Sequence, residues 1–367
     1  KKKKKKNTML VMLTMTEDIL THLTTAYPYM LVFFACVGFA GVATLFLPSL
    51  YRTLCCFRPQ NLRTKYQAEW AIVTGGSSGI GKAIVDKLCS QDINVIILAV
   101  PDDLLTETAR EMSLKYSGVD IIPVGADLSR PGYMEALEEV TSDKNVQLLF
   151  CNAGFMLSGF FADTHVNASK ANSAVNVGCH LELTHAYLNR MLDFSPHEKN
   201  GKRGAIFFTS SPAWMLPSPT AAMYAGTKAF VTHFGCSLAA EVRSKGVDVC
   251  VVHPSPIRSR FYDNAGDGAE VNFFKSTATG PEVLVNHMFA SVGKLVLSNQ
   301  GYFPKVMGMM HKIVDPSFLA EITAQVAHTA ASFKDAEEKA SQQQKKKKKK
   351  KTPRAKKSRG KSRGKKD

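Results

Sequence analysis

The chain has 367 residues, 45% of them hydrophobic, so it is long enough to bury the core of one large globular domain or two modest ones. Its net charge of +16 arises at its ends: Lys1–Lys6 and Lys345–Asp367 hold 21 of the 47 basic residues, and residues 7–344 carry 26 basic against 30 acidic ones. The mildly acidic middle argues against a nucleic-acid-binding domain, and eight cysteines without a Cys-x-x-Cys pair argue against a zinc site or a disulfide framework.

A long uncharged stretch lies near the start of the sequence. Residues 29–47 include no charged side chain, and their length suffices to cross a hydrocarbon core of about 30 Å. We expect a transmembrane anchor at 28–51, after an N-terminal segment at 1–27 and before a linker at 52–67. A cleaved signal peptide or a buried core helix is the alternative, but the length of the stretch and the lack of a basic residue close before it favour a retained anchor.

The charges that flank this stretch predict its orientation. Acidic residues precede it and basic residues follow it: Glu17 and Asp18 on one side, and Arg52, Arg58, Arg63 and Lys65 on the other. By the positive-inside rule, we expect the large domain after the anchor to face the cytosol.

After the linker, the sequence alternates between strand and helix patterns. The apolar run 69–73 leads into the glycine-rich turn 74–81 (TGGSSGIG) and then into a helix, an arrangement that presents a helix N-terminus to a pyrophosphate. Further strands are expected at 94–99, 119–125, 147–151, 204–208 and 247–252, with helices between them that include 133–141 and 167–192. This alternation predicts an α/β domain at 68–330 built on a doubly wound parallel sheet, the Rossmann fold.

Polar clusters follow the predicted strands. Asp127 comes after the third strand, Asn152–Gly154 after the fourth, Ser210 and Ser211 after the fifth, and Pro254 after the sixth. Because open α/β sheets bind ligands at the carboxyl ends of their strands, we expect these clusters to share one site.

Tyr224 and Lys228 are spaced i and i+4 on a predicted helix, which puts a phenol and an ammonium on one face. A neighbouring ammonium stabilises a phenolate, so such a pair can transfer a proton near neutral pH. The spacing alone is more often that of a solvated surface pair, and the other motifs decide between the two readings.

Together these residues resemble the short-chain dehydrogenase/reductase family over residues 68–300. The matching elements are TGGSSGIG at 74–81, Asp127, NAG at 152–154, Asn176, Ser211 thirteen residues before Tyr224, and YAGTK at 224–228. The resemblance implies that Tyr224 is the general acid for a carbonyl oxygen and that Lys228 activates it and holds the nicotinamide ribose. It also implies that Ser211 binds the substrate oxygen, with Ser210 as the adjacent alternative, and that Asn176 positions a relay water.

The resemblance further implies a dinucleotide site. The residues expected to bind the cofactor lie in the glycine-rich turn and at the strand ends: Gly75, Ser77, Gly79, Ile80, Gly81, Asp127, Leu128, Asn152, Ala153, Gly154, Tyr224, Lys228, Pro254 and Ile257. A departure from the family is Pro254-Ser255-Pro256, where relatives usually have Pro-Gly, so we expect a stiffer backbone beside the nicotinamide.

The choice between NADP(H) and NAD(H) stays open in the sequence. Ser78 and Val100 stand where NADP-preferring relatives usually carry a basic residue, and Ala99 stands where NAD-preferring relatives usually carry an acid, although Asp102 and Asp103 follow. Because membrane-bound reductases of this family commonly use NADPH, we expect NADP(H), with NAD(H) as the alternative.

The segments downstream of the sixth strand suggest how substrate is bound. Residues 258–279 are expected to form an irregular lid, whose aromatic residues indicate an apolar ligand: Phe261, Tyr262, Phe273 and Phe274. Residues 301–330 are apolar but interrupted by charges, so they either rest on a bilayer or complete the core. The tail at 331–367 is expected to be disordered and to attract anionic lipid headgroups, with RNA contact, nuclear targeting or solubility as alternatives.

We therefore expect a single-pass enzyme of the endoplasmic reticulum membrane that transfers hydride between NAD(P)(H) and a carbonyl or alcohol of an apolar, lipid-like substrate. The resemblance suggests a 3-oxoacyl-CoA, a 3-ketosphinganine or a steroid, and it is compatible with a homodimer. The end of the chain, 363–367, partly resembles a dilysine retrieval signal. The alternative is a non-catalytic dinucleotide-binding scaffold or sensor at the membrane; a nucleic acid is not expected as a partner.

Overall fold

The computed structural model describes residues 2–55, 58–193, 201–262 and 269–351. The chain divides into two compact units, Lys1–Phe57 and Arg58–Asp367. The first unit contains the helix α1 (Lys2–Cys55). Within α1, Tyr27–Leu54 is long and apolar enough to cross a membrane, and it is the one such stretch among the described residues. The span expected at 28–51 falls inside it.

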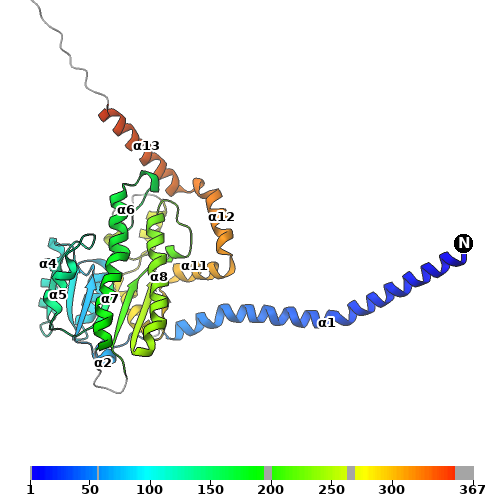
Figure 1. Ribbon diagram of the computed structural model, residues 1–367, viewed down its shortest axis with the longest axis horizontal. Helices are drawn as coiled ribbons and strands as arrows, with labels where there is room; N and C mark the ends of the chain where they lie inside the picture. The colour runs from blue at the N-terminus through cyan, green and yellow to red at the C-terminus, as the bar shows by residue number, and fades with distance from the viewer. Residues whose placement is uncertain (1, 56–57, 194–200, 263–268, 352–367) are drawn as a thin grey trace, which may run out of the picture. The chain divides into compact units, whose positions relative to one another are not determined.

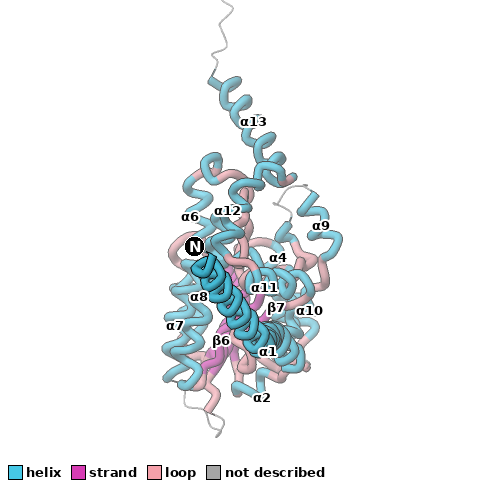
Figure 2. The backbone as a smooth tube through the Cα atoms, turned by 90° about the vertical axis from the view of Figure 1, so that its right-hand side faces the viewer, coloured by secondary structure: helices cyan, strands magenta, loops and turns pink. Residues whose placement is uncertain are grey.

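The second unit is built on a seven-stranded parallel sheet with the strand order β3-β2-β1-β4-β5-β6-β7 (Figures 1 and 2). The strands are β1 (Trp70–Thr74), β2 (Asn94–Ala99), β3 (Ile121–Gly125), β4 (Val146–Cys151), β5 (Gly204–Thr209), β6 (Val247–His253) and β7 (Leu297–Asn299). The order reverses between β1 and β4, so the predicted doubly wound sheet is confirmed, with its ligand crevice at that switch point. Strand β7 was not predicted, because its three residues form no apolar run.

Helices cover both faces of the sheet because both faces of its strands are apolar. On one face pack α2 (Leu62–Tyr66), α3 (Gly79–Cys89), α4 (Asp103–Lys115) and α10 (Pro281–Ser291). On the other face, turned toward the viewer in Figure 1, pack α5 (Tyr133–Thr141), α7 (Cys179–Asp193) and α8 (Ala222–Val242). Each strand sends alternate residues to the two cores, as Ile206 and Phe207 do on β5.

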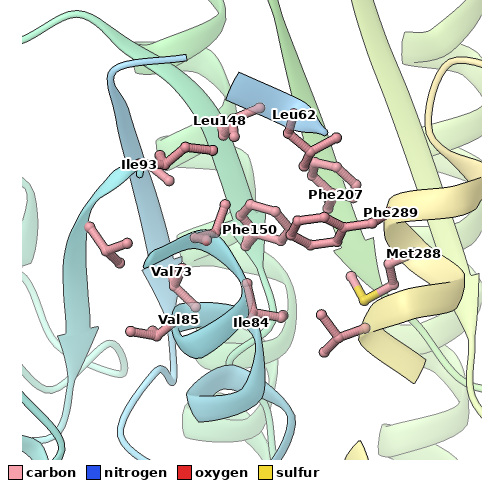
Figure 3. Close-up of a cluster of buried hydrophobic side chains, with 14 of the residues drawn as sticks. Leu62, Val73, Ile84, Val85, Ile93, Leu148, Phe150, Phe207, Met288 and Phe289 are labelled. Carbon is pink, nitrogen blue, oxygen red and sulfur yellow. The ribbon is translucent and has the colours of Figure 1, made fainter. Parts of the chain in front are cut away.

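The first core is organised around stacked aromatic rings (Figure 3). The rings of Phe150 on β4 and Phe207 on β5 are parallel, with their centroids 4.2 Å apart. Phe289 of α10 lies against both, at 6.1 and 6.4 Å. These contacts fix α10 to the centre of the sheet, and the adjoining α3 contributes Ile84 to the same cluster.

Shortening Ile84 tests how tightly this core is packed. Ile84 is fully buried, so we expect Ile84→Val to lower the free energy of unfolding by about 1 kcal/mol, through one lost methyl group and the small cavity left behind. Val283→Ala on α10 is the control, because Val283 is 45% exposed and its change should be under about 0.5 kcal/mol. Equal shifts of the urea midpoint in the two variants would contradict this account of the core.

Two segments differ from their sequence-based expectations, and a third had no predicted secondary structure. The helix expected at 167–192 is divided into α6 (Val166–Ser173), a π-helical turn (Ala174–Gly178) and α7. The irregular lid contains the helix α9 (Ala269–Thr277), while residues 263–268 lie outside the described chain. Residues 301–330 form α11 (Tyr302–Ile313) and α12 (Pro316–Val326), with a short 3₁₀ turn after them.

The expectation of disorder is corrected for the first part of the tail. Residues 331–351 form the helix α13 (Ala331–Lys351), and residues 352–367 lie outside the described chain. Alanine, glutamate, glutamine and lysine are strong helix formers, which favours a helix here despite the low apolar content. Phe333 also packs edge-on against Phe160 at 4.7 Å, and Ala336 is buried, so α13 is held against the folded unit at its N-terminal end.

Candidate active site

Tyr224 and Lys228 lie one turn apart on the buried face of α8. Their side chains are 7% and 3% exposed. Nζ of Lys228 donates to the backbone oxygen of Thr209, at the end of β5, over 2.8 Å and lies 5.7 Å from the centre of the Tyr224 ring. Burial lowers the pKa of Lys228 to about 8, so the ammonium beside the phenol still predominates at neutral pH.

Asn176 occupies the π-helical turn between α6 and α7 and is fully buried. Its Oδ1 accepts from the amide of Phe155 (3.0 Å), and its Nδ2 donates to the carbonyl of Phe155 (3.1 Å) and to Oγ1 of Thr227 (3.1 Å). Thr227 in turn donates to the carbonyl of Tyr224 (2.7 Å). Asn176 thus links α8 to the segment after β4. Thr227 takes part in these hydrogen bonds, a role that the sequence did not predict. Such π-turns recur at functional sites.

The two serines after β5 have different roles. Ser210 is buried, and its hydroxyl forms hydrogen bonds with the carbonyl of Lys228 (3.0 Å) and Oγ1 of Thr232 (2.8 Å). These bonds attach α8 to the end of β5. Ser211 is half-buried, and its Oγ accepts from the amide of Ala213 (3.2 Å). Because that bond uses a lone pair of the oxygen, the Ser211 proton is directed to donate elsewhere, and the geometry favours Ser211 over Ser210 as the group that meets a substrate oxygen.

The glycine-rich turn joins β1 to the N-terminus of α3. Gly75 has a left-handed backbone (φ +64°), and a Cβ on Gly81 would lie 2.0 Å from the carbonyl oxygen of Gly75, so no side chain fits there. This contact brings the start of α3 close to β1. No side chain caps α3 at Ser78, which leaves the first amides of an eleven-residue helix facing the crevice.

Thr74, the last residue of β1, links this turn to the loop after β4. Its Oγ1 donates to the carbonyl of Phe150 (3.1 Å) and accepts from the amides of Asn152 and Ala153 (2.9 Å each). The side chain of Asn152 donates to the carbonyl of Thr74 (3.1 Å) and accepts from Oγ1 of Thr209 (3.1 Å). Thr74 therefore positions the NAG segment, a role that its place in the motif alone did not predict.

Gly154 lies close to both Asn176 and Lys228. A Cβ on Gly154 would lie 3.0 Å from Oδ1 of Asn176 and 3.4 Å from Nζ of Lys228. A side chain here would crowd Asn176, so glycine leaves more space beside the lysine, where a flat ring or a ribose can lie.

A single cavity of about 1660 Å³ brings most of the predicted site residues together. Those that line it are Gly75, Ser77, Gly79, Ile80, Asp127, Leu128, Asn152, Ala153, Gly154, Ser211, Tyr224, Lys228, Pro254 and Ile257. Two do not line it: Gly81 packs beneath the turn, and Asn176 lies behind Gly154.

Part of the cavity lining is apolar, although charged or titratable residues such as Asp163, His165, Arg260, Asp335 and Lys339 also line it. Phe261 and Phe274 line it, whereas Phe273 is 58% exposed and the side chain of Tyr262 lies outside the description. Further apolar lining comes from three parts of the chain: Phe155, Met156, Leu157 and Phe160 after β4, Phe303 and Met307 on α11, and Val326 and Ala327 at the end of α12. An apolar ligand would find contacts along this part of the lining.

Residues 69–269, more than half of the chain, match the sequence profile of the family described as short chain dehydrogenase. This chain belongs to the short-chain dehydrogenase family. The resemblance drawn from the motifs is thereby confirmed.

Two curated relatives illustrate the kinds of protein to which this chain is similar. A very-long-chain 3-oxoacyl-CoA reductase of Laccaria bicolor is 32% identical over 235 residues, which cover 60% of this chain and 66% of that protein, just under two thirds of its length. The Homo sapiens protein named inactive hydroxysteroid dehydrogenase-like protein 1 is 28% identical over 235 residues, which cover 62% of this chain and 67% of that protein. Reductases and a protein named inactive are thus both similar to it.

Two solved structures share the fold. One, from a study of 7β-hydroxysteroid dehydrogenase stereoselectivity, has a TM-score of 0.63 at 26% identity and covers 72% of this chain and 100% of its own. The other, a short-chain dehydrogenase from Sphingobium yanoikuyae in complex with NADPH, has a TM-score of 0.52 at 25% identity and covers 59% of this chain and 81% of its own.

In this short-chain dehydrogenase the end of the cavity beside β2 and β3 carries acidic side chains. Asp127 accepts from the hydroxyl and the amide of Ser129, and these bonds, with Arg130 at 3.2 Å, hold its pKa below the ordinary value. Asp102 caps α4 by accepting from the amide of Leu105 (3.1 Å). Val100 lines the cavity and is 59% exposed, and among the residues that the structure describes none that lines this end is basic.

The structure accommodates the Pro254-Ser255-Pro256 departure without strain. The Ser255 amide donates to the backbone carbonyl (3.0 Å) and the side-chain oxygen (3.1 Å) of Gln300. Among the described residues, only Gln67, Asp92 and Thr220 are non-glycine residues with positive φ, so Ser255 does not need the left-handed backbone that glycine permits. The segment after β6 is therefore anchored by the β7–α11 turn, and Pro254 and Ile257 face the cavity.

Proposed function

We propose that this short-chain dehydrogenase transfers hydride between NADP(H), or NAD(H) as the alternative, and a carbonyl or alcohol of an apolar, lipid-like substrate. A 3-oxoacyl-CoA is the first candidate substrate, and a 3-ketosphinganine and a steroid are the others. One observation carries the proposal: Ser211, Tyr224 and Lys228 line a single cavity that many apolar side chains also line. We place the enzyme in the endoplasmic reticulum membrane, anchored by Tyr27–Leu54 with its folded unit on the cytosolic side, in keeping with the basic residues after that stretch.

The residues present fit a dinucleotide. The uncapped N-terminus of α3 and the backbone of Gly75 and Gly79 would hold a pyrophosphate. The gap above Gly154, beside Lys228, would take the nicotinamide ribose. When bound, the nicotinamide supplies or accepts the hydride.

The chain's own residues would handle the oxygen and the proton. The Ser211 hydroxyl donates to the carbonyl oxygen of the substrate, where negative charge develops during reduction. Tyr224 donates its proton to the same oxygen, and the Lys228 ammonium favours the phenolate left behind. The Thr209 carbonyl accepts a hydrogen bond that holds Lys228 in place. Asn176 bonds to both Phe155 and Thr227, which fixes α8 against the loop at Phe155.

A second candidate function is dinucleotide binding without catalysis, as a scaffold or sensor at the membrane. The 28% identity to a human protein named inactive favours it. The presence of Ser211, Tyr224 and Lys228 in one cavity weighs against it.

Turnover of a ketone panel separates the two candidates. The purified full chain in phospholipid nanodiscs is incubated with NADPH or NADH and with a long-chain 3-oxoacyl-CoA, 3-ketosphinganine, a ketosteroid or a short polar ketone, while nicotinamide absorbance is followed. We expect oxidation of NADPH with at least one apolar ketone. Turnover of the polar ketone alone would overturn the lipid assignment, and NADPH binding without any turnover would favour the non-catalytic function.

The cofactor preference can be changed at Val100. An arginine there would stand directly after β2, where the adenosine ribose and the 2′-phosphate of NADP(H) would lie. Because the position is exposed, we expect Val100→Arg to raise the ratio of kcat/KM for NADPH over NADH by only about tenfold. Val100→Leu is the control for added bulk, and an equal ratio in both variants would place the adenosine ribose elsewhere.

A further inference from the structure

Helices α11 and α12 carry a large exposed apolar surface. We define the apolar patch as Met309, Met310 and Ile313 of α11 with Phe318, Ile322 and Val326 of α12. Their exposures run from 39% at Met310 to 65% at Ile313. No residue of α12 is buried, although more than half of its residues are apolar. Exposed apolar residues gathered on two consecutive helices of a folded unit indicate a place where another apolar phase or molecule binds.

The same two helices line the active-site cavity on their inner side. Phe303 and Met307 of α11 and Thr323 and Val326 of α12 face the cavity that holds Tyr224. Val326 belongs to both surfaces, since it lines the cavity and is also 50% exposed. The apolar patch therefore continues into the mouth of the cavity, and whatever covers the patch also borders the route to the active site.

The chain enters the second unit on the β7 side of the sheet, at the amino-terminal ends of the strands, whereas α11 leaves the carboxyl end of β7. The side-chain amide of Gln60 donates to the carbonyls of Phe289 (3.1 Å), Ala290 (3.1 Å) and Val292 (2.9 Å) at the end of α10. That end of α10 is bonded to β7, because Ser291 and Ser298 share a hydrogen bond of 2.8 Å. Helix α11 follows β7 directly and packs on it; α10, β7 and α11 lie together facing the viewer in Figure 2.

We infer that the apolar patch rests in the surface of a lipid bilayer and admits apolar substrate from the bilayer to the cavity. The candidate span Tyr27–Leu54 precedes Gln60 by only a few residues, so a short connection tethers the second unit to any bilayer that α1 crosses. Exposed Lys305 and Lys312 sit on α11 beside the patch, and Tyr302 is 82% exposed at the start of the helix. Lysines that extend toward headgroups and exposed tyrosines are typical of such a boundary.

Two other occupants are outcomes of the test. A second copy of the chain would cover the patch in a homodimer, and α13 or another segment of the chain would cover it if that segment moved. Neither brings the cavity mouth to a source of apolar substrate. The inference rests on the proposed function for its account of substrate access, but contact with lipid can be measured without any catalysis.

The contact is tested by photo-crosslinking in the full chain. A benzophenone amino acid replaces Ile313 in one sample and Leu114 in another, and both are reconstituted in phosphatidylcholine nanodiscs that contain a radiolabelled lipid. Leu114 is the matched control, because it is 73% exposed on α4, next to β3 at the opposite edge of the sheet. We expect lipid labelling from position 313 to exceed that from position 114 by at least about tenfold. Equal labelling, or a crosslinked dimer from position 313, would overturn the inference.

A functional arm separates this inference from the proposed function. In the double variant Ile313→Asp, Phe318→Asp, we expect KM for a long-chain ketone in the nanodisc to rise by about tenfold and KM for a short water-soluble ketone to stay unchanged. Leu114→Asp should change neither. Equal KM values for native and double-variant protein would overturn substrate access through the patch, whereas loss of all turnover in the native protein would overturn the proposed function and leave the crosslinking result standing.

Discussion

Replacement of Tyr224 by Phe should lower kcat for ketone reduction by about 10²–10⁴-fold, the range observed when a positioned general acid is removed. The change deletes one hydroxyl and keeps the ring. The ring is 7% exposed, lies 5.7 Å from Phe261 and faces Lys228, so Phe fills the same space. The fold and the affinity for NADPH should therefore be retained, with a Kd within about twofold of the native value. Nicotinamide absorbance gives kcat, and quenching of protein fluorescence gives the Kd.

Tyr302→Phe is the matched control for this variant. Tyr302 is 82% exposed on α11, so loss of its hydroxyl should leave kcat unchanged. Full activity in Tyr224→Phe would falsify the assigned proton donor. A variant that also failed to bind NADPH would point instead to a structural role for the hydroxyl.

The sheet and most of its strands could be predicted from the sequence because buried parallel strands give uninterrupted apolar runs. Residues 94–99 are predicted and observed with the same bounds, and the run at 204–208 is extended by one residue. Strand β7 escaped prediction because three residues carry no such signal. Its pairing is decided by β6, whose edge would otherwise be open.

The members of the site could be predicted from motif order, but their supporting contacts could not. Sequence order places Tyr224 and Lys228 on one helix face and the polar clusters at strand ends, and the structure gathers these into one cavity. The hydrogen bonds of Thr74 to the NAG segment and of Asn176 to Thr227 depend on which strands and helices lie side by side. No local pattern encodes that proximity.

The segments after β7 show the limit of local patterns. Charged residues within 301–330 left the choice between a core element and a bilayer-facing element open, because an amphipathic helix satisfies both. The exposed outer side of α11 and α12 and their inner side against the cavity now favour the bilayer-facing role. Helix α13 was missed because its composition resembles that of disordered tails, although its residues are also strong helix formers.

The pH dependence of the reaction should identify Lys228 as the cation that supports Tyr224. Burial lowers the pKa of Lys228 from 10.5 to about 8 in the folded protein, so its ammonium loses the proton at a lower pH than an exposed lysine does. Because the proposed mechanism needs the ammonium, kcat/KM for ketone reduction should be high below pH 8 and should fall as pH rises through about 8. The pH profile of kcat/KM reports groups of the free enzyme, so it is the quantity to measure.

Two lysines of the described chain have a pKa of about 8, and substituting each in turn shows which one causes the fall of kcat/KM. Lys65, beside Asp248, is also desolvated by burial to a pKa of about 8, but it lies at the opposite, amino-terminal end of β6 and lines no part of the cavity. Lys65→Met should therefore keep the fall of kcat/KM near pH 8, although it disturbs an ion pair. Lys228→Met should lower kcat/KM at pH 7 by about 10²-fold or more, and kcat/KM should then no longer fall near pH 8. If kcat/KM of Lys228→Met still fell near pH 8, another group would carry the proton whose loss stops the reaction. The ammonium beside Tyr224 would then serve only to hold the cofactor.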